Sequence, residues 1–190
     1  MGVRFFTAEN RKTIEWSGGT STELFLHPQD GNFAERRFQF RLSTATVVAD
    51  TATFTRLEGV TRHLMILKGN LELTHEGHYS KYLQPYEQDA FPGEWTTHSK
   101  GAVTDFNLML KDGLSGSLQH IRLEKNQGKS FAATALHYFL YLVTGKAITQ
   151  KGDDIKATDL LQIELGDSLY IEATDPCHII LIAVHGATNH

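Results

Sequence analysis

Two segments of the sequence share the same order of features. Residues 63–95 and residues 138–173 each start with an apolar stretch that ends in glycine, followed by a second stretch, a glycine-containing turn, a third stretch and an aspartate. The matched positions are Gly69 and Gly145, Gly77 and Gly152, Leu83 and Leu160, and Asp89 and Asp167. Because a sequence repeat constrains the architecture before any local pattern does, we interpret the two segments as copies of one structural unit.

Short apolar segments separated by turn residues run through the whole chain. In residues 104–110, TDFNLML, alternation places Asp105 and Asn107 on one face of a strand and Phe106 and Leu108 on the other. Sustained helical periodicity is absent, and only residues 130–138 could form a short helix. The sequence therefore predicts an all-β fold with little helix.

Length and charge limit the classes of partner. The 190 residues, 41% of them apolar, suit one large domain or two small ones. The net charge of -4 is spread along the chain, which disfavours nucleic-acid or membrane binding by bulk charge. No apolar run approaches the roughly 20 residues needed to cross a bilayer, so we expect a cytoplasmic protein. A homo-oligomer is compatible with these features.

The repeated pattern resembles the cupin unit, a small double-sheet β-barrel of the jelly-roll type. Two such units imply a bicupin with two barrels. We place the N-terminal barrel, with extra N-terminal strands, at residues 1–124 and the C-terminal barrel at residues 125–190. Strands from the N-terminus are expected to complete the sheets of either barrel.

Histidines are the first candidates for chemistry in such a fold, because metal-dependent cupins use an H-x-H pair, a Glu and a later His. The sequence has no H-x-H, and the strand before Gly69 offers only His63. His75 and His78 fall in a predicted turn that we interpret as solvated. We therefore expect no bound metal or cofactor. The alternative is a metal-dependent enzyme, a dioxygenase or isomerase, that uses His63, His98 and a carboxylate.

Signatures of other catalytic classes are also missing. The sequence contains no G-x-G-x-x-G, no Walker A loop and no G-x-S-x-G elbow. No feature places a histidine base beside a serine. The sequence therefore identifies no catalytic residue, and we do not expect an enzyme.

Polar side chains within apolar strands are the candidates for a binding site. Arg41 and Ser43 share one strand face, and a guanidinium group can bind a carboxylate through two parallel hydrogen bonds. The same alternation is also typical of a sheet with one solvated face, on which an arginine stem covers apolar surface. Residues 16–22 present Trp16, two glycines and several hydroxyl groups, either as a plain turn or as part of a site.

Six blocks of sequence carry a more specific resemblance. They are residues 16–23 (WSGGTSTE), 40–45 (FRLSTA), 54–62 (FTRLEGVTR), 67–69 (LKG), 91–94 (FPGE) and 105–109 (DFNLM). In order and spacing these blocks resemble the HutD/Ves family. This bacterial bicupin family is associated with histidine utilisation in its HutD branch and with stress responses in its Ves branch.

The resemblance implies a non-metal bicupin that binds a small anionic metabolite, with a regulatory role and no established reaction. The implied ligand-binding residues are Trp16, Thr20, Arg41, Ser43, Arg62, Asp105 and Asn107. Arg41 and Arg62 would bind a carboxylate, while Asp105 and Asn107 would contact a nitrogen-bearing end. Formiminoglutamate, formylglutamate and urocanate meet this description. A third alternative is a structural or interaction module in which the polar faces are solvated.

Overall fold

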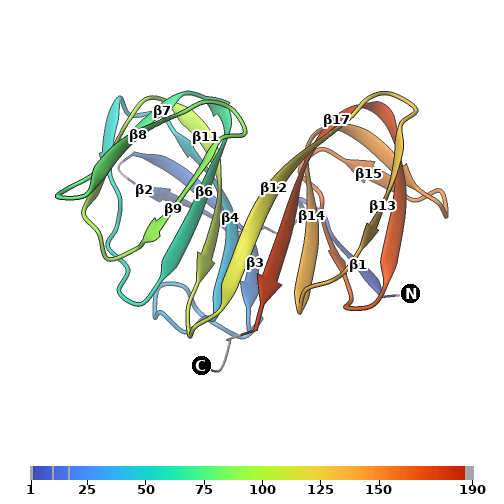
Figure 1. The fold of residues 1–190 in the computed structure, drawn as a ribbon, viewed down its shortest axis with the longest axis horizontal. Coiled ribbons are helices and arrows are strands. Elements are labelled where there is room, and N and C mark those ends of the chain that lie inside the picture. The colour runs from blue at the N-terminus through green and yellow to red at the C-terminus, as the bar shows by residue number, and fades with distance from the viewer. Residues whose placement is uncertain (1, 10, 17, 187–190) are drawn as a thin grey trace. The chain divides into compact units, whose positions relative to one another are not determined.

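The computed structural model describes residues 2–9, 11–16 and 18–186, and these residues form strands and no helix (Figure 1). The strands are β1 (Val3–Phe6), β2 (Thr13–Trp16), β3 (Gly19–His27), β4 (Phe40–Val47), β5 (Thr51–Thr53), β6 (Thr61–Gly69), β7 (Leu71–His75), β8 (Tyr79–Leu83), β9 (Gln88–Pro92), β10 (Thr97–Lys100), β11 (Val103–Leu110), β12 (Ser115–Leu123), β13 (Gly128–Ala132), β14 (His137–Thr149), β15 (Asp154–Lys156), β16 (Leu160–Ile163) and β17 (Ser168–His185). The prediction of an all-β fold is confirmed.

Internal contacts divide the chain into two units. The N-terminal unit comprises residues 11–114, and the C-terminal unit comprises residues 2–9 together with residues 115–186. The division differs from the predicted segments 1–124 and 125–190 because backbone pairing assigns both flanking strands to the C-terminal unit. β1 pairs with β16, and β12 pairs with β17 along its whole length.

Two sheets form the N-terminal unit. The six-stranded sheet has the order β2-β3-β4-β11-β6-β9, and the four-stranded sheet has the order β5-β10-β7-β8. Leu64 and Ile66 from the first sheet pack with Leu71, Leu73 and Leu83 from the second in one buried cluster. The alternation of these residues in β6 and β7 therefore buries the faces that the two sheets turn toward each other.

β11 lies between β4 and β6, and its register aligns the polar positions of three strands. Met109 is opposite Arg41 on one side and Arg62 on the other, and Asn107 is opposite Ser43. Because side chains alternate along a strand, these residues project from the same face of the sheet. Residues distant in sequence therefore meet on one face.

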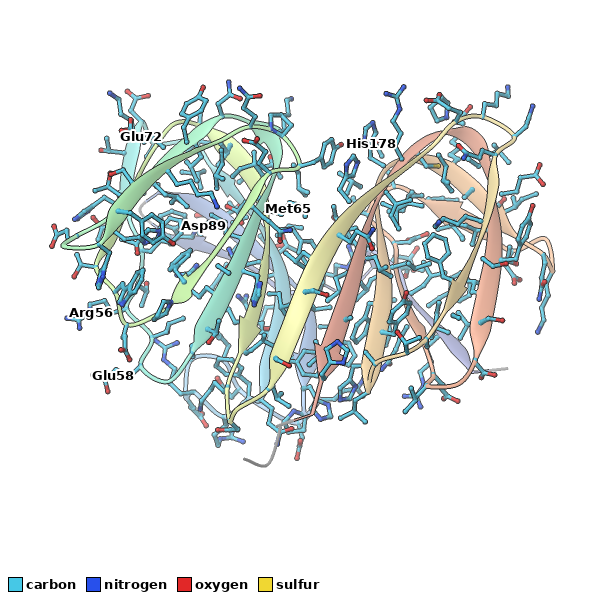
Figure 2. The ribbon with its side chains drawn as sticks, viewed as in Figure 1. Arg56, Glu58, Met65, Glu72, Asp89 and His178 are labelled. Atoms are coloured by element: carbon cyan, nitrogen blue, oxygen red, sulfur yellow. The ribbon has the colours of Figure 1, made fainter. Side chains whose placement is uncertain are left out.

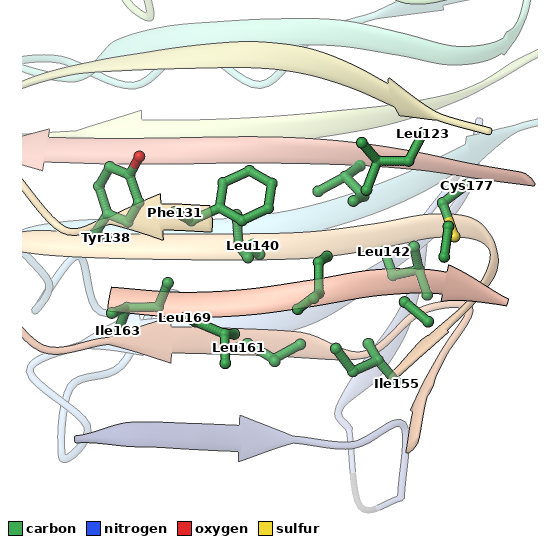
Figure 3. Packing of buried hydrophobic residues seen from close by; sticks show 14 of the residues in the cluster. Leu123, Phe131, Tyr138, Leu140, Leu142, Ile155, Leu161, Ile163, Leu169 and Cys177 are labelled. Atoms are coloured by element: carbon green, nitrogen blue, oxygen red, sulfur yellow. The ribbon is translucent and has the colours of Figure 1, made fainter. Parts of the chain in front are cut away.

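The C-terminal unit has one seven-stranded sheet in which β14 and β17 are long central strands. The main order is β1-β16-β14-β17-β12, while β13 pairs with β17 and β15 pairs with β14. The register between β14 and β17 shifts between Leu142 and Ala147, where bulges allow the strands to bend. Its core is apolar, with Leu140, Ile163 and Ile179 each at most 2% exposed (Figure 3).

Two sequence expectations differ from the structure. The ladders end at edge strands rather than forming rings among the described residues, so the prediction of closed barrels is not confirmed. Residues 130–138 form no helix, because Phe131 pairs with Leu169 in β17. No helix in the described part of the chain is long and apolar enough to cross a membrane.

The matched glycines have a common backbone role. Gly69 and Gly145 have φ angles of 83° and 92°, in the left-handed region that glycine adopts without a steric penalty. A Cβ at either position would collide with a backbone carbonyl oxygen, that of Ala102 or Pro176. The two glycines therefore occupy equivalent constrained positions in the two units.

We expect the substitution Leu140→Ala to lower the free energy of unfolding by about 2–5 kcal/mol, because it leaves a cavity in a packed core. Leu165→Ala is the matched control, since Leu165 is 59% exposed and its truncation should change stability by no more than about 0.5 kcal/mol. Urea denaturation followed by circular dichroism measures both. Equal effects of the two substitutions would contradict the placement of this core.

Candidate functional site

A cavity of about 260 Å³ lies in the N-terminal unit. Its walls come from β2, β3, β4, β6 and β11, from Phe33 in the loop between β3 and β4, and from Thr53, Phe54, Thr55 and Leu57. The polar side chains in these walls are Ser21, Arg41, Ser43, Thr53, Thr55, Arg62, Asp105 and Asn107. The cavity therefore opens on the sheet face that the register of β11 defines.

Arg41 is held on three sides by neighbouring groups. Its side chain is 4% exposed, and its Nε donates to Glu23 Oε2 at 2.9 Å in an ion pair. Its Nη1 donates to Ser43 Oγ at 3.0 Å, and its Cζ lies 4.2 Å from the centre of the Phe33 ring. The positive charge of Arg41 is therefore balanced inside the protein by Glu23.

Arg62 has far fewer partners. Its Nη2 donates to Asn107 Oδ1 at 3.3 Å, whereas its buried Nε has no hydrogen-bond partner among the described residues. Its guanidinium group lies near two neighbouring aromatic rings, with Cζ 4.7 Å from the centre of Phe54 and 5.6 Å from that of Phe91. Burial lowers the pKa of Arg62 to about 10, so the group remains a cation at neutral pH.

Asp105 is the carboxyl group that hydrogen bonds connect to Arg62. Asn107 Nδ2 donates to Asp105 Oδ1 at 3.1 Å, so Asn107 connects Asp105 with Arg62. Burial raises the pKa of Asp105 to about 7, against the opposing effects of the Asn107 hydrogen bond and the positive charge of Arg62. Near neutral pH Asp105 is therefore only partly ionised, and it compensates Arg62 incompletely.

The charges of the cavity do not balance. Arg41 is paired with Glu23, but Arg62 donates only one of its five N–H groups to an acceptor in the described chain. A buried cation without full compensation is costly, and an anion that reaches it recovers both charge and hydrogen bonds. The arrangement is therefore suited to binding a small anion.

Six of the seven predicted ligand-binding residues line this one cavity. They are Trp16, Arg41, Ser43, Arg62, Asp105 and Asn107. Thr20 does not line it, because Thr20 is in β3, where Ser21 faces the cavity and Thr20 alternates with it. The neighbouring Ser17 lies outside the described residues.

Sequence reasoning missed Phe33, Phe54 and Glu23. Phe33 and Phe54 lie outside the polar alternation that identified the site, and each places its ring beside an arginine. Glu23 was present in the block WSGGTSTE but carried no signal of its own, because its partner Arg41 is on another strand. Only the pairing of β3 with β4 brings that carboxylate to Arg41.

A second polar cluster overturns the interpretation of His75 as part of a solvated turn. His75 is 1% exposed at the end of β7, with Nδ1 2.8 Å from Thr97 Oγ1 and Nε2 3.0 Å from Asp89 Oδ2. Tyr79 and Lys81 also donate to the Asp89 carboxylate, which is labelled in Figure 2. This network connects β7, β8 and β10 with β9, so we assign it a structural role between the two sheets.

The alternative metal site is not assembled. His63 alternates on β6 with Arg62 and Leu64 and therefore projects from the opposite face of the six-stranded sheet. His98 is on β10 of the other sheet, where its ring contacts Glu76 and Thr53. The grouping of His63 with His98 was therefore wrong. Within residues 2–9, 11–16 and 18–186, no three His, Cys, Asp or Glu side chains are grouped to hold a metal ion.

The chain is similar to proteins of known family and structure. A family model described as HutD matches residues 8–182. The conserved protein of unknown function PA5104 from Pseudomonas aeruginosa PAO1 is 24% identical with a TM-score of 0.82, covering 98% of this chain and 100% of that chain. HutD from Pseudomonas fluorescens SBW25, in a formate condition, is 23% identical with a TM-score of 0.75, covering 97% and 100%.

More distant structures share the fold alone. YhhW from Escherichia coli is 13% identical with a TM-score of 0.73, and the match covers 100% of both chains. The structural neighbours are cupin-fold proteins, which supports the cupin-type architecture. No curated protein sequence matches the chain.

We expect the stability of the unliganded protein to depend on pH through Asp105. Because its pKa rises from 3.8 to about 7 on folding, the folded state binds more protons than the unfolded state between these values. Stability from this group is greatest below the unfolded pKa and falls with rising pH, by up to about 1.4 kcal/mol per pH unit. Relative to the parent, Asp105→Asn should therefore gain stability as the pH rises from about 4 to about 7, with no further gain above that range.

The control for this experiment is Asp50→Asn, because Asp50 is an exposed aspartate of the same unit. Urea denaturation at each pH gives the free energies of unfolding of the three proteins. A difference between Asp105→Asn and the parent that stays constant with pH would show that Asp105 titrates normally.

Proposed function

The chain belongs to the HutD family, and we propose that it binds a small carboxylate metabolite in the cavity of its N-terminal unit. The observation that carries this proposal is the incomplete compensation of buried Arg62, which is 7% exposed and donates to Asn107 alone. The relation of the two units as cupin barrels of a bicupin is part of the same proposal. It is supported by the matched glycines Gly69 and Gly145.

Arg62 is the anchor for the carboxylate in this proposal, and Arg41 is a secondary contact. The N–H groups of Arg62 that lack a protein acceptor would donate to the carboxylate oxygens. Arg41 already donates to Glu23 and Ser43, so it has fewer groups to offer. Ser43 Oγ accepts from Arg41, which leaves its hydroxyl hydrogen to donate to the ligand.

A nitrogen-bearing group of the ligand would meet Asp105 and Asn107, which line the cavity beside Arg62. A partly ionised Asp105 can accept from an N–H group when charged or donate from its own O–H when neutral. The cavity volume of about 260 Å³ is below the roughly 300–1,000 Å³ typical of sites for drug-sized ligands. Formiminoglutamate, formylglutamate and urocanate are small, carry a carboxylate and have a nitrogen-bearing or formyl end, so they remain the candidates.

We propose binding rather than catalysis, with a regulatory role connected to histidine utilisation or to stress responses. The described residues that line the cavity include serine and threonine hydroxyls but no histidine, lysine or cysteine. A hydroxyl nucleophile requires an adjacent base, and the only carboxyl group among the described lining residues, Asp105, is hydrogen-bonded to Asn107. The site therefore resembles a receptor for an anion more than a reaction centre.

We expect at least one of the three candidate metabolites to stabilise the protein. A ligand present at 100 times its Kd raises the free energy of unfolding by about 2.7 kcal/mol, because it binds the folded state alone. A thermal-shift screen with formiminoglutamate, formylglutamate, urocanate and acetate measures the effect. No shift with any carboxylate would favour a structural or interaction module.

We expect Arg62→Ala to weaken binding of the ligand found in that screen by roughly 10- to 100-fold, since charge-assisted hydrogen bonds contribute about 1.5–3 kcal/mol. Arg41→Lys should weaken it less, because Arg41 is already paired with Glu23. Arg56→Ala is the control, as Arg56 is an exposed arginine of the same unit (Figure 2). Isothermal titration calorimetry gives the affinities, and equal affinities for parent and Arg62→Ala would place the ligand elsewhere.

A further inference from the structure

A second cavity of about 160 Å³ adjoins the candidate ligand cavity. The two cavities share three lining residues, which are Ile14, Phe33 and Arg41. Glu23 and Leu26 line the second cavity but not the first. The three shared side chains therefore form the wall between two separate spaces.

Phe33 is the part of this wall that comes from a loop. Its ring lies against the Arg41 guanidinium and packs with Phe38 at a centroid distance of 5.5 Å. The loop is closed by two backbone hydrogen bonds between Asn32 and Arg37, at 2.9 and 3.0 Å. The contacts with Arg41 and Phe38 therefore hold the ring of Phe33 in place within a closed loop.

Arg41 is hydrogen-bonded to a lining residue of each cavity. Its Nε donates to Glu23, which lines the second cavity, whereas its Nη1 donates to Ser43, which lines the first. The guanidinium group is thus hydrogen-bonded to one lining residue of each cavity. Arg41 is fixed by both bonds, and of the other two shared side chains Phe33 is larger than Ile14, so the removal of Phe33 would open the wall most.

We propose that Phe33 determines the length of the ligand by closing the cavity on the side of Arg41, two strands away from Arg62. This inference rests on the proposed function, since it requires a carboxylate anchored at Arg62. With Phe33 in place, an unbranched chain that extends from the carboxylate stops at the ring. Without the ring, the chain continues past Ile14 into the second cavity, where Leu26 and Ala34 provide apolar surface beside the polar side chains of Lys12, Glu23 and Asn32.

The test is the binding of unbranched monocarboxylates of increasing length, from formate to octanoate, to the full chain. Where space allows, each added methylene should raise affinity about fourfold, because its burial contributes about 0.8 kcal/mol. We expect affinity for the parent protein to rise and then fall at a defined chain length. In Phe33→Ala the fall should occur at a chain at least two methylenes longer.

Two further variants make the result specific to the wall. Leu26→Ala enlarges the second cavity without opening the wall, so it should keep the chain-length limit of the parent. Phe33→Leu retains part of the ring volume and should shift the limit less than Phe33→Ala, which also covers the case in which the alanine variant fails to fold. Calorimetry measures the affinities, and circular dichroism confirms the fold.

The outcomes separate this inference from the function on which it rests. The same limit in the parent, Phe33→Ala and Phe33→Leu would overturn the role of Phe33 while leaving carboxylate binding intact. A shift of the limit in Leu26→Ala equal to that in Phe33→Ala would also overturn it. If no monocarboxylate binds any of these proteins but formylglutamate or urocanate binds the parent, chain length is not selected at Phe33. If no carboxylate binds at all, both proposals fail.

Discussion

The register of β11 between β4 and β6 is the constraint on which the site depends. It places Met109 between Arg41 and Arg62 and puts Asn107 beside Ser43. A slip of one residue would turn Asp105 and Asn107 to the opposite face, where Phe106 and Leu108 are fully buried. The strong preference for burying those apolar side chains therefore also fixes the polar ones in the cavity.

The two buried arginines show how similar residues on one sheet acquire different roles. Arg41 is neutralised by Glu23 and fixed by Ser43, so it is a permanent part of the protein's own structure. Arg62 is supported mainly by the rings of Phe54 and Phe91 and by one long hydrogen bond to Asn107. Unpaired buried charge is costly to maintain, and proteins tolerate it chiefly where a partner is supplied from outside.

The two units share a strand pattern but use their interiors differently. In the C-terminal unit the space between the strands is filled with side chains such as Leu140, Ile163 and Ile179 (Figure 3). In the N-terminal unit the apolar cluster around Leu64 and Ile66 fills only part of the interior, and the remainder is the polar cavity. The difference lies in the residues at the inward positions, because the backbone alternation is the same in both.

The sequence by itself determined the all-β class, the constrained glycines at Gly69 and Gly145, and the polar pairs on β4 and β11. These follow from local properties, since alternation decides which neighbours share a face and glycine alone accepts the backbone at those turns. It did not determine the burial of His75, the position of Thr20 outside the cavity lining, or the presence of Glu23 and Phe33 beside Arg41. Only the tertiary structure decided these, because strand periodicity does not specify which face is covered, and pairing between distant strands is what brings their side chains into contact.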